Sequence, residues 1–371
     1  MTAHSKVLVL TINSASSIPV LHHLLGELAK THDVEVIECD IVGYPDLPKP
    51  VTIRPIVRFE TAQEYNNQSF GFKLRKYSTV LTRGLLAKIR EKNVILYVID
   101  WQILTLLIPL NPFLKAHGWK IVYHQFELSE SLPPAFRGPL APQIDLAIFP
   151  EIHRKNYFFE RYNRSNIKKH LVLPNTCPLP GQSTELPTLA TEGRRVIGHI
   201  GNIGPRHFLD TLISLIEILP QDEFFFLIIG GTSPEVEERL APYADYENVC
   251  RLGHLSHEQL GQFYRLIDIG LILYRGLDLN FEYCAPNKLY EYWSYGIQVL
   301  AHQLTGLNPI FQNDTQGKLF DLEDPAAVSH ATDWLSSTDL DKHQTTQYFD
   351  RHYSLPHYLA QYVETIAELT H

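Results

Sequence analysis

The sequence predicts an α/β protein with two doubly wound, Rossmann-like domains. Short apolar runs of strand length alternate with stretches of helical periodicity, which is the pattern of parallel βαβ units. The alternation stops in a segment rich in proline, glycine, serine and threonine, residues 178–193, and starts again at Arg195. A chain of 371 residues is long enough to bury two such cores. We therefore expect a first domain over 1–178, a linker over 179–193 and a second domain over 194–350.

The composition narrows the classes of function. Apolar residues make up 44% of the chain and charged residues 20%, as in an ordinary globular enzyme. The net charge of −9 argues against a nucleic-acid partner, so small-molecule partners are expected. The four cysteines show neither zinc-ligand spacing nor a disulfide framework. Because the first strand begins at Val7 without a signal-peptide pattern, we expect a cytoplasmic protein.

The first domain opens with a buried strand over 7–12 and a helix whose leucines recur at helical spacing up to Leu28. The loop between them lies where open α/β sheets bind ligands, so Asn13 and Ser14 are candidates for contacts with an acceptor molecule. Capping of the helix by serine is the simpler alternative. Asp100 follows the strand-like run 94–99 and is a further acceptor-side candidate for the same reason.

Residues 71–92 form the one basic segment of this acidic chain. Seven lysines and arginines against one glutamate give the segment a charge of +6. A basic helix of this kind can lie on an anionic membrane or meet a phosphorylated lipid acceptor, which would make the protein membrane-associated. A solvated helix face is the alternative. The apolar run after Asp100 stays far shorter than the roughly 20 residues that a membrane span requires, so only peripheral contact is expected.

A strand that begins at Lys120 runs into a polar loop that ends at Leu128. His124 and Glu127 are the polar candidates here, because either side chain could orient or deprotonate an acceptor hydroxyl. Two ordinary polar loop residues are the alternative. Strand-like runs over 145–150 and 171–175 complete the first domain.

The second domain restarts with a strand and two glycine turns. The first turn contains Gly201, Asn202 and Gly204, and its glycines permit close approach of the backbone to a ligand. Arg206, at the start of the next helix, could bind a phosphate through two hydrogen bonds. The strand over 224–229 ends in a second glycine turn, and another short strand ends in a loop. These two features contribute the candidates Gly230, Gly231 and His254.

Residues 282–300 combine a loop, a helix and a strand. Pro286 suits a first helical turn and Gly296 suits a helix end, which predicts a helix from about Pro286 to Tyr295 and a strand after it. The N–H groups of the first turn form an anion site, and Lys288 in that turn is electrostatically misplaced unless an anion compensates it. Glu291 follows one turn later, where its carboxylate could accept hydrogen bonds from two ribose hydroxyls. An ordinary surface helix is the alternative.

The stretch from Pro286 to Leu300 resembles the nucleotide-sugar signature of the GT4-type glycosyltransferases, which have the GT-B fold of two Rossmann-like domains facing across a cleft. The resemblance implies that Glu291 holds the donor ribose and that the turn containing Asn287, Lys288 and Leu289 approaches the diphosphate. Many members carry a second glutamate eight positions before the first. Tyr283 occupies that position here and Glu282 precedes it, so both are sugar-side candidates.

The resemblance extends, more weakly, to other parts of the chain. Residues 123–128 are similar to the family's Tyr-Asp-Ser-His-Glu-Leu stretch, with the histidine position taken by Phe126, and this match favours Glu127. The two glycine turns resemble the family's glycine turns around the nucleotide. The loop with His254 resembles the family's loop beside the base. The resemblance also implies a last helix, within 351–371, that returns to the first domain.

We therefore predict a glycosyltransferase that moves a sugar from a nucleoside-diphosphate sugar to a glycan, lipid-linked or protein acceptor in bacterial-type glycan or glycolipid synthesis. Glu127, Arg206 and Lys288 are the expected catalytic residues, and the resemblance implies retention of the anomeric configuration. No cofactor beyond the co-substrate and no metal are expected. The Asp-x-Asp match at Asp339 and Asp341 lies in a polar tail rather than at a strand end.

Two alternatives stay open. A sugar-nucleotide epimerase or hydrolase with the same fold would use the donor site without an acceptor. A non-catalytic binding subunit is suggested by Phe126 and Tyr283, which stand where the family has polar residues.

Overall fold

The structure is a computed structural model of the chain. The residues that it describes are 5–41, 47–59, 70–128, 130, 132–177, 189–191, 193–255 and 257–370. The chain forms two compact units, one of Met1–Pro174 with Leu355–His371 and the other of Asn175–Ser354. Most of the expected linker, 179–193, lies outside the described residues.

Unit 1 is built on a seven-stranded sheet in which every neighbouring pair is parallel, with the order β3-β2-β1-β4-β5-β6-β7. Its strands are β1 (Lys6–Leu10), β2 (Asp33–Ile41), β3 (Thr52–Phe59), β4 (Ile95–Val98), β5 (Lys120–His124), β6 (Ile144–Phe149) and β7 (Ile167–Val172). Strand β3 is not anticipated by the sequence analysis.

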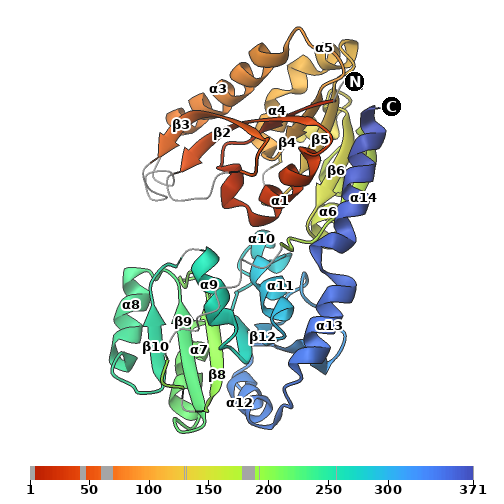
Figure 1. The fold of residues 1–371 in the computed structure, drawn as a ribbon. Helices are drawn as coiled ribbons and strands as arrows, with labels where there is room; N and C mark the ends of the chain where they lie inside the picture. Colours follow the sequence, from red (N-terminus) through yellow and green to blue (C-terminus); the bar gives the residue numbers. More distant parts are fainter. Residues whose placement is uncertain are drawn as a thin grey trace. The chain divides into compact units, whose positions relative to one another are not determined.

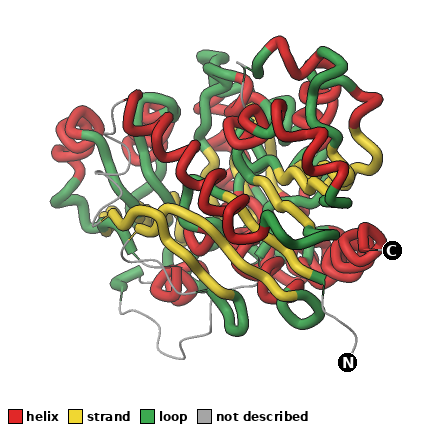
Figure 2. The backbone as a smooth tube through the Cα atoms, turned by 90° about the horizontal axis from the view of Figure 1, so that it is seen from above, coloured by secondary structure: helices red, strands yellow, loops and turns green. Residues whose placement is uncertain are grey.

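Helices cover both faces of this sheet. Figure 2 draws the helices in red and the strands in yellow. They are α1 (Pro19–Leu28), α3 (Phe70–Lys88), α4 (Trp101–Leu106), α5 (Asn111–Ala116), α6 (Ile152–Arg161) and α14 (Leu355–Ala367). One apolar core joins α1 and α14 to the sheet, and a second core joins α3, α4 and α6 to it. The last helix of the chain therefore belongs to unit 1 (Figure 1).

Unit 2 has a six-stranded sheet, again with every neighbouring pair parallel, in the order β10-β9-β8-β11-β12-β13. Its strands are β8 (Arg195–Ile200), β9 (Phe224–Ile229), β10 (Val249–Leu252), β11 (Ile269–Ile272), β12 (Gln298–His302) and β13 (Gly317–Phe320). Two parallel sheets with interleaved helices confirm the predicted fold class.

The helices of unit 2 are α7 (Leu209–Ile218), α8 (Pro234–Leu240), α9 (His257–Tyr264), α10 (Leu279–Glu282), α11 (Asn287–Ser294), α12 (Ala327–Ser337) and α13 (Lys342–His352). Helices α7, α8 and α12 share one core with the sheet, and α9, α11 and α13 share the other. Short 3₁₀ turns occur at Ala15–Ser17, Ile108–Leu110, Pro134–Arg137, Arg164–Asn166, Ala241–Tyr243, Asp314–Gln316 and Glu368–Thr370.

Helix α11 begins one residue later than predicted. Pro286 is the residue that precedes the first turn, with extended backbone angles of φ −73° and ψ 127°, rather than a member of that turn. Gly296 adopts the left-handed φ of +73° that closes the helix, as its position predicts. The short helix α10 precedes α11. Among the described residues, no helix has the length and apolar character needed to cross a bilayer.

Candidate functional site

Helix α11 is fixed to the carboxyl end of strand β8 by one tyrosine. The Tyr292 hydroxyl accepts a hydrogen bond from the Ile200 N–H at 3.0 Å and donates one to the Gly198 carbonyl at 3.1 Å. Its ring packs on Gly270 of β11, where a Cβ would lie 2.7 Å from ring carbons. Trp293, the next residue, donates to the Gln316 carbonyl at 2.9 Å. The first turn of α11 is thereby held at the sheet edge where α/β proteins bind ligands.

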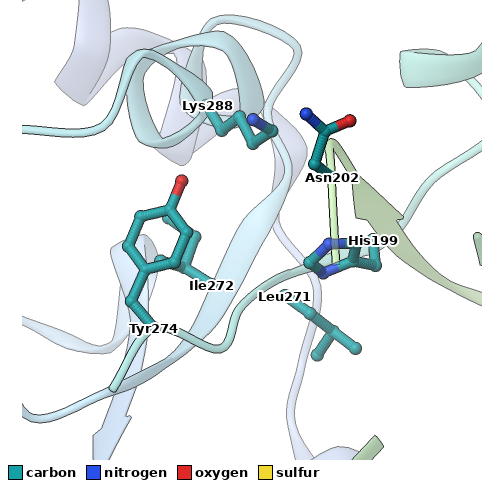
Figure 3. Close-up of a pocket in the computed structure, with 6 residues that line it drawn as sticks. All are labelled: His199, Asn202, Leu271, Ile272, Tyr274 and Lys288. Atoms are coloured by element: carbon teal, nitrogen blue, oxygen red, sulfur yellow. The ribbon is translucent and has the colours of Figure 1, made fainter. Parts of the chain in front are cut away.

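Lys288 projects from this first turn across Gly201. Gly201 has a φ of +121°, and a Cβ at this position would lie 2.3 Å from the Lys288 Nζ, so only glycine admits the lysine here. Among the described residues, no carboxylate forms an ion pair with Lys288. Its ammonium group borders a small cavity of about 10 Å³ whose lining residues are His199, Asn202, Leu271, Ile272, Tyr274 and Lys288 (Figure 3).

The two glycine turns pack backbone to backbone. Gly230 has a φ of +141°, and a Cβ there would lie 2.2 Å from the Gly201 carbonyl oxygen. The Asn202 side-chain oxygen accepts a hydrogen bond from the Gly231 N–H at 3.1 Å. Gly204 differs from these two glycines, because a Cβ there would meet no described atom within 4 Å. Its N–H lies 3.2 Å from the His207 Nδ1.

Arg206 forms an ion pair with a carboxylate of the same chain. Its guanidinium lies 2.7 Å from the Asp278 carboxylate and 5.3 Å from the centre of the Phe281 ring. Asp278 also caps α10 by accepting the Phe281 N–H at 3.0 Å. A phosphate that binds Arg206 must therefore compete with the Asp278 carboxylate.

Glu291 is buried, with 8% of its surface exposed. Within the described part of the chain, its carboxylate has one partner, the Tyr264 hydroxyl, which donates to Oε2. Burial and the Glu291 charge raise the pKa of Tyr264, which therefore remains a donor at neutral pH. Tyr264 stacks on Tyr295 with ring centres 5.1 Å apart. One carboxylate oxygen of Glu291 is fixed by this contact and the other is left for a ligand.

The remaining donor-side and sugar-side candidates differ in their surroundings. The Glu282 carboxylate accepts the Thr305 N–H at 3.1 Å and also the Thr305 hydroxyl, so it ties α10 to the loop after β12. Tyr283 follows α10 and is half-buried. Leu289 is fully buried in the core beneath α11, whereas Asn287 is partly exposed and His254 is exposed.

In unit 1, Asp100 and Asn13 lie together. The Asp100 carboxylate accepts the Ile12 N–H at 2.8 Å and the Asn13 side-chain N–H at 3.4 Å. Burial raises the pKa of Asp100 to about 6, and the Glu127 charge adds to this, whereas hydrogen bonds from Ile12 and Thr11 oppose it. Asp100 therefore orders the loop after β1 from its place at the end of β4.

Ser14 does not cap a helix through its side chain, contrary to the simpler alternative. Its buried side chain precedes a 3₁₀ turn and makes no capping hydrogen bond, and α1 begins later, after Ile18. The Ala15 N–H is instead bound by the buried Glu38 carboxylate of β2 at 2.6 Å. Strand β2 contains three other acidic residues, so the sequence alone does not single out Glu38.

His124 and Glu127 have opposite environments. His124 is fully buried, its Nδ1 lies 2.7 Å from the Tyr97 hydroxyl, and burial lowers its pKa to about 3. Tyr97 in turn accepts a hydrogen bond from Tyr362 of α14 at 3.4 Å. Glu127 is exposed at the end of the same segment, where a ligand can reach it. A neutral, buried imidazole is poorly placed for proton exchange with an acceptor.

Several residues at these sites were not predicted. They are Glu38, Tyr97, His199, His207, Tyr264, Tyr274 and Asp278. The described residues contain no group of three or more His, Cys, Asp or Glu side chains that could hold a metal ion.

Comparisons with known proteins agree with this geometry. Residues 194–338 match the model of the family described as glycosyl transferases group 1. No curated protein matches the chain. Solved structures match it over nearly its whole length. The sucrose-phosphate synthase (tll1590) from Thermosynechococcus elongatus has a TM-score of 0.67 at 13% identity, covering 98% of this chain and 99% of that one.

Two further structures are similar to the same degree. Anabaena Alr3699/HepE in complex with UDP-glucose has a TM-score of 0.65 at 13% identity, with 98% of this chain and 100% of that one covered. The α,α-trehalose-phosphate synthase (UDP-forming) from Burkholderia vietnamiensis has a TM-score of 0.64 at 14% identity, with 99% of each chain covered. At these identities the structures show the shared GT-B fold, and the family match lies in unit 2. The chain therefore has the GT-B fold, and its residues 194–338 match the family of group 1 glycosyl transferases.

Proposed function

We propose that this chain transfers a sugar from a nucleoside-diphosphate sugar, bound by unit 2, to an acceptor hydroxyl bound by unit 1, in bacterial-type glycan or glycolipid synthesis. The observation that carries the proposal is Lys288, which has no carboxylate partner in the described chain and lies beside Gly201 in the first turn of α11. Glu291 follows one turn later with a free carboxylate oxygen. A cation at the positive end of a helix is favourable when an anion binds there.

The diphosphate is the leaving group of the proposed reaction. As the bond from the anomeric carbon to the diphosphate breaks, negative charge grows on the phosphate oxygens, and Lys288 with the N–H groups of α11 would stabilise it. These groups supply the charge that a metal ion supplies in other transferases, so we propose a metal-independent reaction. Retention of the anomeric configuration is proposed from the resemblance of residues 286–300 to the GT4-type signature.

A UDP-sugar is the first donor to test. One similar structure contains UDP-glucose and another is described as UDP-forming. Those ligands belong to those proteins, and their fold is shared by this chain. We assign the ribose to Glu291, because Tyr264 holds one of its carboxylate oxygens and leaves the second for ribose hydroxyls.

The acceptor is assigned to the loops at the carboxyl ends of β1, β4 and β5. Both oxygens of Asp100 already accept hydrogen bonds from Ile12 and Asn13, so we give Asp100 the role of ordering this loop. Glu127 is exposed and carries the carboxylate that would orient the acceptor hydroxyl or accept its proton. The acceptor proton leaves as the new bond to the anomeric carbon forms.

We further propose that helix α3 contacts an anionic membrane. Phe72, Arg75, Arg83 and Leu86 are exposed, and at 100° per residue they fall on one side of the helix. The charge of this face is smaller than the segment total of +6, because Lys76 is buried and Lys88 pairs with Glu35 at 3.1 Å. The side chain of Lys73 lies outside the described residues.

Calorimetry with UDP, GDP, ADP and dTDP and their common sugars, each with and without EDTA, tests the donor assignment. We expect one nucleotide to bind, with no effect of EDTA. Glu291→Gln should lower the affinity for this nucleotide about tenfold. The affinity for its 2′-deoxy form should fall much less, because the lost hydrogen bond is to a ribose hydroxyl. Binding of none of them to folded protein would contradict the proposal. Conversion of the donor without an acceptor would favour an epimerase or hydrolase, and binding without any turnover would favour a binding subunit.

A further inference from the structure

His199 is a buried polar side chain of unit 2. It lies in strand β8, and 2% of its surface is exposed. Within the described part of the chain, neither ring nitrogen has a hydrogen-bond partner of normal geometry. Burying an unpaired imidazole opposes folding, and an apolar residue at this position would avoid that cost. The neighbours of His199 along β8 show that the strand accepts such residues, because Ile197 and Ile200 are buried and apolar.

The ring of His199 borders the cavity beside Lys288. Figure 3 shows Lys288 and Asn202 along one rim, with Tyr274 across the cavity from His199. The volume of about 10 Å³ is close to that of a single water-sized group. The cavity therefore has room for one oxygen atom of a larger ligand, and an ammonium group and an imidazole both face it.

His199 is neutral in this environment. Burial lowers its pKa to about 3, and the nearby charges of His207 and Lys288 lower it further, whereas backbone groups of Gly201 and Asn202 oppose the shift. The His207 ring lies edge-on, with ring centres 6.1 Å apart. A neutral imidazole still has one N–H donor. An oxygen that accepts hydrogen bonds from this N–H and from the Lys288 ammonium would be favoured if it carried negative charge.

We infer that His199 is a ligand-binding residue of the donor site, which donates its ring N–H to a phosphate oxygen that Lys288 also binds. This inference rests on the proposed function, because it needs a nucleoside diphosphate at α11. His199 transfers no proton in this role. The described residues offer its ring no partner of normal geometry, because the hydrogen bond that we assign to it forms only with the ligand.

The variant His199→Phe tests the inference because the two possible roles predict opposite results. Phenylalanine removes both nitrogens and keeps an aromatic ring. We expect the melting temperature to stay the same or rise, and the affinity for the nucleoside diphosphate that binds best to fall about tenfold or more. The affinity for the corresponding nucleoside, measured by ligand-observed NMR, should not change, because the nucleoside has no phosphate.

His302 provides a matched control in the same unit. It is buried like His199, but its Nδ1 accepts the Leu322 N–H at 3.1 Å. His302→Phe should lower the melting temperature and leave nucleotide affinity unchanged, since its ring has a structural partner. His199→Gln keeps an N–H donor and should restore part of the affinity lost in His199→Phe.

Each remaining outcome is decisive. A lower melting temperature of His199→Phe with unchanged diphosphate affinity would give His199 a structural role and overturn the inference. Equal losses for the nucleoside and the diphosphate would overturn it as well, as would a glutamine variant that recovers stability without affinity. In all three cases nucleotide binding by the unmodified protein would leave the proposed function standing. If the unmodified protein bound no nucleotide, the proposed function and this inference would both fail.

Discussion

The Lys288 side chain lies against Gly201 so closely that a Cβ at position 201 would be 2.1 Å from the lysine Cε. The two residues are far apart in sequence and come from the first turn of α11 and the end of β8. Tyr292 of α11 joins the same two elements through its hydroxyl, which accepts a hydrogen bond from the Ile200 N–H and donates one to the Gly198 carbonyl. The position of the ammonium group is thus set by a glycine without a side chain and by a buried tyrosine.

Gly201→Ala should destabilise the protein and abolish nucleotide binding. The substitution forces a side chain into a φ of +121° and into the volume of Lys288. A loss of about 2 kcal/mol in the free energy of unfolding is expected. Gly204→Ala is the control, because a Cβ there meets no described atom within 4 Å, and it should change stability by less than about 0.5 kcal/mol. Urea denaturation measures both, and equal effects would contradict the assignment.

Lys288→Ala should reduce turnover strongly with little change in stability. No ion pair is lost within the described residues, and removing a cation from a helix N-terminus is neutral or slightly favourable. Lys342→Ala should give the reverse result, because Lys342 pairs with Asp268 at 2.9 Å and donates to the Ile267 carbonyl at 3.0 Å. Steady-state kinetics and thermal melting of the two variants form the test. Unchanged kcat/KM in Lys288→Ala would remove the lysine from the proposed site.

The helix that carries Lys288 was predictable from sequence because its ends have local causes. Gly296 and Pro286 act through their own backbone restrictions, so the predicted and observed bounds differ by one residue at each end. Strand β3 was missed because it is an edge strand. Its residues are mostly exposed or half-buried, and Pro55 interrupts the strand pattern.

The side-chain partners around the site were not predictable, because they depend on residues distant in sequence. Arg206 and Asp278 are separated by 72 positions, and their ion pair follows from the packing of α10 beside the loop before α7. Whether the ring of His199 has a partner among the described residues likewise depends on what β11 and α11 place near it. Local patterns identify residue types that bind phosphate, whereas only the folded chain shows which of them already have partners.

Asp278→Asn should increase the affinity for a nucleoside diphosphate. The asparagine still accepts the Phe281 N–H that caps α10, but it no longer competes for the Arg206 guanidinium. A gain of several-fold is expected, because the pair is partly exposed and its Coulomb energy is small. Arg206→Ala should weaken binding, and the double variant should show no gain from Asp278→Asn. If the gain persists without Arg206, the competition between Asp278 and the ligand is disproved.

Asp100 should make the stability of the protein fall as the pH rises from about 4 to about 6. Its folded-state pKa is raised from the ordinary 3.8 to about 6, so the folded protein binds the proton more tightly than the unfolded chain does. The stabilisation is complete below pH 4 and lost above pH 6. Its upper bound is about 3 kcal/mol, and the partial exposure of the side chain reduces this value.

The comparison of Asp100→Asn with the unmodified protein isolates this effect from the other titrating groups. Asparagine cannot ionise. The free energy of unfolding of Asp100→Asn, relative to that of the unmodified protein, should therefore be higher at pH 7 than at pH 4.5. Urea denaturation at the two pH values measures the difference. A stability difference that is independent of pH would show that Asp100 titrates at its ordinary value.

Vesicles of phosphatidylglycerol should bind the protein more tightly than vesicles of phosphatidylcholine, through the exposed face of α3. Replacing Arg75 and Arg83 by glutamate should reverse the charge of this face and prevent sedimentation with the anionic vesicles. Leu86→Ser should also weaken binding to the anionic vesicles, since 67% of this leucine is exposed and available for the lipid interface. Lys115→Glu with Lys318→Glu makes the same change of net charge on exposed residues elsewhere and should have little effect. Equal losses in both double variants would show that net charge alone, and not helix α3, determines vesicle binding.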